Sequence, residues 1–161
     1  MKSVKIPLLE IAKWLLVVLL ILFVASQMAT GKESATEFSV MEETVVGSAD
    51  LSALQSGDNQ MIKRLYGLDP SQYEGMTLYY PTTNMGAEEI LLVKLSDVSQ
   101  QEEVLAAIDA RLATQKSNFD GYGVGQTEML NAAVVEPQGN YILFVVGDHA
   151  QNVRQAFLDA L

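Results

Sequence analysis

The chain has 161 residues, of which 49% are hydrophobic, and it carries a formal net charge of −10 at pH 7. Nucleic acids and anionic lipid surfaces are bound by extended basic patches, so we expect no nucleic-acid partner for this acidic chain. The sequence contains no cysteine, which excludes disulfides, a lipid attached through cysteine, a thiol nucleophile and a thiolate metal site.

Residues 6–28 form a strongly apolar stretch, with an uninterrupted apolar core from Trp14 to Ala25. A helix over residues 6–28 is about 34 Å long, enough for a hydrocarbon layer of roughly 30 Å, whereas one over residues 14–29 reaches only about 24 Å. The longer helix predicts a single-pass signal anchor, and the shorter one predicts an export signal cleaved near Ser26. A helix buried in a soluble core is the third alternative. Residues 1–29 are therefore predicted to be a membrane anchor or signal segment.

The charges on either side of this segment predict its orientation. Residues 1–29 carry a net charge of +2, whereas residues 30–161 carry 7 basic and 19 acidic side chains. The positive-inside rule then places the amino terminus in the cytoplasm and the remainder of the chain outside a plasma membrane. Residues 30–35 are predicted to be a tether, and residues 36–161 a single extracytoplasmic domain.

Two helices are expected at the start of this domain. Residues 36–46 have apolar side chains at i, i+3 and i+7 from Phe38, which is the spacing of an amphipathic helix. A second helix is expected to begin after Asp58, a favourable N-cap residue. It should end at Gly67, because glycine suits the left-handed position that follows many helices.

Alternating segments rich in β-forming residues predict two hairpins. The first pairs residues 76–80 with residues 89–95, and the second pairs residues 132–136 with residues 141–146 across a turn at 137–140. Residues 89–95 are apolar on both faces of the expected strand. This strand is therefore predicted to be central and covered on both sides.

Capping residues indicate where the helices that cover the sheet begin. Ser99-Gln-Gln-Glu102 is typical of a capping box and opens a helix to about Ser117, and Asp148 is expected to cap the terminal helix. The predicted fold class is α+β. It consists of an N-terminal transmembrane helix, two further helices and a β-β-α-β-β-α domain with a four-stranded, mainly antiparallel sheet.

Four residues form the candidate site: Glu89, Arg111, Gln115 and Tyr122. Glu89 begins the predicted central strand, while Arg111 and Gln115 border the apolar stripe of the helix expected to pack on it. A guanidinium binds a carboxylate through two parallel N–H bonds, and Tyr122 is placed to close over it. The cluster is predicted to be either a structural clamp between helix and sheet or a contact for a ligand or partner.

No residue pattern predicts an enzyme. His149 is the single imidazole, and its position suggests an exposed residue at a helix start rather than a catalytic base. The run Gly121–Gly125 follows a helix and lacks the Lys-Ser/Thr ending of a phosphate loop. Glu88 and Glu89 point to opposite faces of a strand, and no Asp/Asn/Gly pattern of a calcium loop is present. We expect no catalytic residue, no cofactor and no metal.

Several local motifs point together to a family. They are Glu89-Ile-Leu-Leu-Val-Lys94, Arg111 with Gln115, the aromatic pair Phe119 and Tyr122, and Gly139-Asn-Tyr141. Their order resembles the domain of unknown function 4358 family over roughly residues 38–161. The resemblance implies a small extracytoplasmic protein of Gram-positive bacteria that is held by a membrane helix or a lipid. Because the chain has no cysteine, the apolar helix is the anchor that remains.

The resemblance also implies a role and a partner. Genes of this family often lie beside those of membrane-bound O-acyltransferases, which implies an accessory part in modifying cell-surface polymers. We expect a non-enzymatic accessory or interaction module of the bacterial cell envelope, with surface-polymer acyltransferase machinery as its partner. The alternative is an exported binding module for a cell-surface polymer or small ligand. Its aromatic platform would be formed by Tyr66, Tyr73, Tyr79, Tyr80 and Tyr122.

Overall fold

The computed structural model describes residues 13–21 and 33–161, which fall in two compact units, Met1–Gly31 and Lys32–Leu161. Residues 13–21 are helical, and a helix of that length extends only about 14 Å along its axis. Among the described residues, no helix combines the length and the apolar character needed to cross a membrane.

This finding contradicts the predicted transmembrane helix and the single-pass plasma-membrane localisation that was inferred from it. The described part of the segment covers less than half of the roughly 30 Å of hydrocarbon that a span must cross. The other parts of the predicted anchor, residues 6–12 and 22–28, lie outside the described residues.

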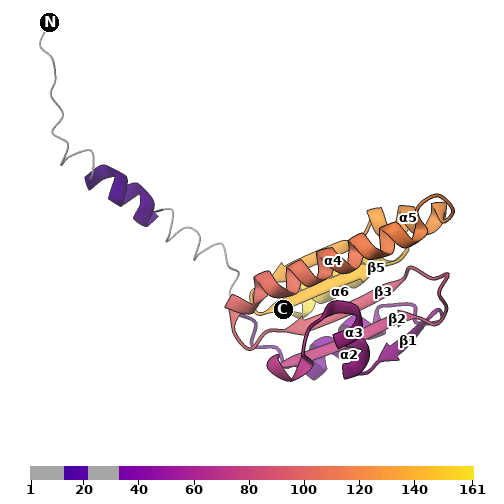
Figure 1. The fold of residues 1–161 in the computed structure, drawn as a ribbon. Helices are drawn as coiled ribbons and strands as arrows, with labels where there is room; N and C mark the ends of the chain where they lie inside the picture. Colours follow the sequence, from indigo (N-terminus) through magenta and orange to yellow (C-terminus); the bar gives the residue numbers. More distant parts are fainter. Residues whose placement is uncertain (1–12, 22–32) are drawn as a thin grey trace, which may run out of the picture. The chain divides into compact units, whose positions relative to one another are not determined.

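Residues 33–161 form an α+β domain around one antiparallel sheet (Figure 1). Its elements are α2 (Phe38–Gly47), β1 (Leu54–Gly57), α3 (Asn59–Tyr66), η1 (Pro70–Gln72), β2 (Gly75–Pro81), β3 (Glu89–Lys94), η2 (Val98–Gln100), α4 (Gln101–Phe119), α5 (Val124–Asn131), β4 (Val134–Gln138), β5 (Tyr141–Val146) and α6 (Ala150–Ala160). The sheet has five strands in the order β1-β2-β3-β5-β4, and every neighbouring pair is antiparallel.

The predicted α+β class is correct, but the predicted four-stranded sheet is wrong. The additional strand is β1, which lies between α2 and α3 in the chain and pairs with β2 at the sheet edge. β1 has one large apolar residue, Leu54, and its two central residues are exposed. A short, polar edge strand has no period-two pattern, so backbone pairing with β2 determines its conformation.

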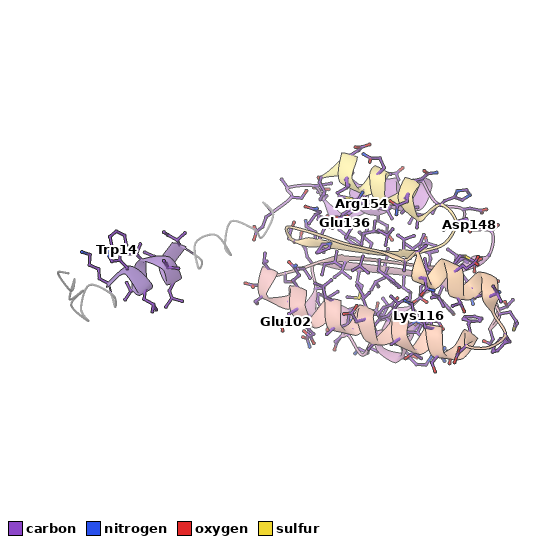
Figure 2. All side chains as sticks on the ribbon, turned by 90° about the horizontal axis from the view of Figure 1, so that it is seen from above. Trp14, Glu102, Lys116, Glu136, Asp148 and Arg154 are labelled. Atoms are coloured by element: carbon purple, nitrogen blue, oxygen red, sulfur yellow. The ribbon has the colours of Figure 1, made fainter. Side chains whose placement is uncertain are left out.

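The prediction of a central strand covered on both faces is confirmed by β3. All six of its residues are buried, and β2 and β5 flank it. Leu91 and Val93 pack on the side of α3, α4 and α5, whereas Ile90 and Leu92 pack on the side of α2 and α6. The domain therefore has three layers, and Figure 2 shows the sheet between α6, which carries Arg154, and α4.

Several predicted ends of elements are confirmed. Asp58 caps α3 by accepting a hydrogen bond from the Met61 N–H at 2.8 Å, and Gly67 follows the helix with a φ of 71°. Three other ends differ from the prediction. The capping box is formed by Asp97 and Gln100 at η2 instead of beginning at Ser99.

The second hairpin and the last helix also differ from the prediction. β4 extends to Gln138, so the turn contains only Gly139 and Asn140, and Gly139 has a φ of 58°. A two-residue hairpin turn requires this left-handed backbone, which glycine adopts at little cost. α6 has His149 at its N-cap without a side-chain cap, so the predicted cap by Asp148 is wrong.

The segment that leads into α2 is attached to the end of the domain. Ser34 donates its backbone N–H to Oδ1 of Asn140 at 2.9 Å. The Thr36 hydroxyl donates to the Ala160 carbonyl at 2.8 Å, and the Tyr141 hydroxyl donates to the Thr36 carbonyl at 2.9 Å. Carbonyls at a helix C-terminus have no partner within the helix, so Thr36 satisfies one that α6 leaves open.

The attachment through Tyr141 predicts a loss of stability at high pH. Burial, and secondly the negative charge of Glu74, raise the pKa of Tyr141 to about 12. Since an unfolded tyrosine has a pKa near 10, the unfolded chain binds fewer protons than the folded chain between about pH 10 and 12. The contribution of protonated Tyr141 to the free energy of unfolding is therefore complete below about pH 10, and it is lost as the pH rises to about 12. Urea unfolding should show this loss, and Tyr141→Phe should diminish it; identical pH profiles would contradict the assignment.

A second prediction concerns the contact between β2 and α2. A Cβ added to Gly75 would overlap the ring of Phe38, whereas a Cβ added to Gly47 has no heavy atom within 4 Å. Gly75→Ala should therefore lower the free energy of unfolding by about 1–3 kcal/mol, the usual cost of overpacking. Gly47→Ala is the matched control and should not destabilise the domain. Equal unfolding free energies for the two variants would show that this packing is incorrect.

Candidate functional site

The candidate site is centred on a buried carboxylate at the start of the central strand. The Glu89 side chain is 1% exposed and lies on the face of β3 that carries Leu91 and Val93. This face is covered by α3 and α4. Because removing an ionised carboxylate from water costs several kcal/mol, Glu89 requires strong donors from those two helices.

Both helices supply such donors. Nε of Arg111 lies 3.0 Å from Oε1 and 3.2 Å from Oε2 of Glu89, and Nη2 of Arg111 lies 2.7 Å from Oε2. The Tyr66 hydroxyl, at the end of α3, donates to Oε1 of the same carboxylate. Glu89 is thus held by a two-point guanidinium contact and a phenol, which are charge-assisted hydrogen bonds of the strong kind.

The pKa values of the two donors reflect this arrangement. Burial, followed by the charge and hydrogen bond of Glu89, raises the pKa of Tyr66 well above its ordinary value. Burial alone would lower the pKa of Arg111, but the hydrogen bond and charge of Glu89 outweigh it and the net pKa is raised. Near neutral pH, Tyr66 is therefore a neutral hydrogen-bond donor and Arg111 is a cation.

The predicted contact between Arg111 and Glu89 is present, but Tyr122 does not close over the guanidinium. The Tyr122 side chain is 62% exposed, and its ring centroid lies 6.0 Å from that of Phe119. Gln115 is buried, and its Oε1 accepts a hydrogen bond from Nδ2 of Asn118 at 3.4 Å.

Tyr66 is the member of the cluster that sequence reasoning missed. Its place on the apolar face of α3, four residues after the buried Ile62, indicates that it points into the domain. A buried tyrosine normally needs a partner for its hydroxyl. That partner is unknown from sequence, because helical periodicity does not say which face of the sheet α3 covers.

A groove of about 580 Å³ adjoins the cluster. Its walls come from β1, α3, the end of β2, the following loop and the C-terminal half of α4. The polar side chains that line it include Arg64, Thr82, Asn84, Arg111, Gln115 and Asn118. No lining residue is Asp or Glu, although residues 30–161 contain 19 of them. The groove is thus a region of basic and amide groups in an acidic domain.

Arg111 belongs to both the cluster and the groove. Its Nε and Nη2 are bonded to Glu89, while its Nη1 makes no hydrogen bond to any described residue. The described residues contain no buried side-chain nitrogen or oxygen without a partner, so Nη1 is not fully enclosed. The carboxylate fixes one edge of the guanidinium. Arg111, whose side chain is 11% exposed, also contributes to the wall of the groove.

The lone histidine lies elsewhere. His149 is exposed and lines a smaller cavity of about 160 Å³ together with Asp50 and Ser52. A backbone hydrogen bond from Ser52 is the main cause that lowers the pKa of Asp50. Within residues 13–21 and 33–161, no three His, Cys, Asp or Glu side chains are grouped to hold a metal ion. The expected absence of catalysis stays a prediction.

Comparison with known proteins identifies one family. The family model described as a domain of unknown function (DUF4358) matches residues 47–147. No curated protein and no solved structure matches the chain. The matched range contains the Glu89 cluster and every residue that lines the groove.

The cluster predicts that two ion pairs of the domain contribute very different amounts to its free energy of unfolding. Arg111→Ala leaves Glu89 buried without its cation, which should lower the free energy of unfolding by about 3–5 kcal/mol. Arg154→Ala removes a more exposed pair with Glu136, in which Nε lies 2.5 Å from Oε2, and should cost about 1 kcal/mol or less. Urea unfolding measures both.

A rescue variant separates the lost charge pair from lost packing. Glu89→Gln in the Arg111→Ala background removes the stranded charge and should regain part of the stability. If Arg111→Ala costs no more than Arg154→Ala, or if Glu89→Gln gives no rescue, the cluster is not the clamp described above.

Proposed function

The chain belongs to the DUF4358 family, and we propose that its domain is a non-enzymatic interaction module that holds a partner protein in the groove beside Arg111. The observation that carries this proposal is a guanidinium that Glu89 holds in place and that lines the wall of the groove. Fixed donors bind with little loss of side-chain entropy, which favours recognition.

Apolar side chains beside the groove support a protein as the partner. Met85, Tyr122 and Val124 are 60%, 62% and 73% exposed. The Gln126 side chain donates to the Met85 carbonyl at 3.1 Å, so the start of α5 lies against the loop between β2 and β3. We call these three side chains the apolar rim. Met and Tyr are enriched at protein interfaces, and exposed apolar side chains that gather together often mark such surfaces.

The alternative of a polymer-binding surface built from tyrosines has less support. Tyr66 and Tyr73 are buried, and Tyr79 and Tyr80 are half-buried on opposite faces of β2. Of the five tyrosines proposed for a platform, Tyr122 alone is exposed. A stacking surface for sugar rings needs several exposed aromatic rings that face the same way.

The non-enzymatic part of the proposal is supported by the sequence. The chain has one histidine and no cysteine, which leaves few groups able to act as a nucleophile or a general base near neutral pH. The single histidine lines a cavity that shares no residue with the groove.

Site-directed photocrosslinking in cells of the source organism tests the proposal. A photoreactive amino acid is placed at Tyr122 or Val124 on the apolar rim, and at Val40 of α2 as an exposed control at 52%. The proposal predicts a defined protein adduct from both rim positions and none of that size from Val40. Adducts of equal yield from all three positions, or none from the rim, would contradict it.

A further inference from the structure

Most of the basic side chains of the domain form ion pairs within it. Residues 33–161 contain six Lys or Arg side chains, and four of them form ion pairs. The pairs are Lys63 with Asp69, Lys94 with Glu74, Arg111 with Glu89, and Arg154 with Glu136. The two that form no ion pair with a described residue are Arg64 and Lys116.

Arg64 is the one of these two that lines the groove. It is exposed on α3, and the hydrogen bond found for its side chain joins Nη2 to the Met61 sulfur at 3.0 Å. A thioether is a weak acceptor that carries no charge. The guanidinium of Arg64 therefore retains a full positive charge at the groove.

The two arginines contribute differently to the field in the groove. Glu89 offsets most of the charge of Arg111, so Arg111 contributes a positioned N–H donor through Nη1. Arg64 contributes the uncompensated charge. Amide side chains of Gln115 and Asn118 add further polar groups, and no carboxylate lines the groove to compete for them. Groups that accept hydrogen bonds and carry negative charge fit this lining.

The apolar rim distinguishes a peptide from a small anion. Met85 and Tyr122 are more than half exposed beside the arginine-lined groove, and an isolated anion would leave them in water. A peptide with apolar side chains next to its acidic ones would cover both features.

From this arrangement we propose that the groove binds an acidic peptide segment of the partner protein. Its carboxylates contact Arg64 and Nη1 of Arg111, and its neighbouring apolar side chains cover Met85 and Tyr122. This inference rests on the proposed function, because it specifies the chemistry of the partner segment.

Fluorescence anisotropy on the full chain provides the test. The probe is a fluorescein-labelled peptide of repeated Glu-Glu-Leu-Leu units, and the reference peptide carries Gln in place of Glu. The Glu peptide should bind more tightly than the Gln peptide, and added salt should weaken it. Arg64→Gln should weaken its binding by about fivefold, the effect of one partly exposed ion pair.

Lys116→Gln is the matched control, because it removes the same charge from a residue that does not line the groove. It should leave the affinity for the Glu peptide unchanged. Equal binding of the Glu and Gln peptides, or equal weakening by Arg64→Gln and Lys116→Gln, would overturn the inference. Binding of free glutamate as tight as that of the peptide would also overturn it, since the apolar rim would then have no role.

These outcomes are separate from those of the crosslinking experiment. Adducts confined to the apolar rim, together with no preference for the Glu peptide, would overturn the acidic segment and leave the interaction module in place. The absence of rim adducts in cells would remove the interaction module even if the Glu peptide binds in solution.

Discussion

An ionised carboxylate in an apolar interior is the constraint on which the rest of this domain depends. Glu89 is 1% exposed, and it is held by donors from two different helices, Tyr66 of α3 and Arg111 of α4. Because neither helix can move away without stranding the charge, α3, α4 and β3 are linked at one point. The same bonds hold the Arg111 guanidinium against the sheet and leave its Nη1 edge at the groove wall. Arg111 therefore joins helix to sheet and, in the proposed function, also contacts the partner.

The charged side chains at the two ends of the central strand point to different layers of helices. Glu89 and Lys94 are the first and last residues of β3, and an interval of five residues directs them to opposite faces. Lys94 points to the face covered by α2 and α6. Its Nζ lies 2.5 Å from Oε1 of Glu74 and 5.6 Å from the ring centroid of Tyr141. That face carries the attachment of residues 33–36, and the other carries the groove. The attachment of the leading segment and the groove thus lie on opposite sides of the sheet.

Local chemistry explains which parts of this arrangement were predictable. Asp58 and Gly67 mark the ends of α3 through caps that depend on neighbouring residues alone, and the apolar pattern of β3 identified a central strand. The contact of Arg111 with Glu89 was predicted because both occupy borders of apolar surfaces. β1 has no such pattern, and Tyr66 joins the cluster only through tertiary packing. The membrane span was predicted from the length and apolar character of residues 6–28, and the described helix over residues 13–21 is too short for it.

Nuclear magnetic resonance of isotope-labelled arginine side chains tests the double use of Arg111 most directly. In the free protein, the Nε–H of Arg111 should exchange with water far more slowly than that of the exposed Arg64, because Glu89 accepts its hydrogen bond. Addition of a groove-binding peptide should shift the Nη1 resonance of Arg111 while the Nε–H remains protected. Rapid exchange of the Arg111 Nε–H in the free protein, or loss of its protection when the peptide binds, would contradict the account.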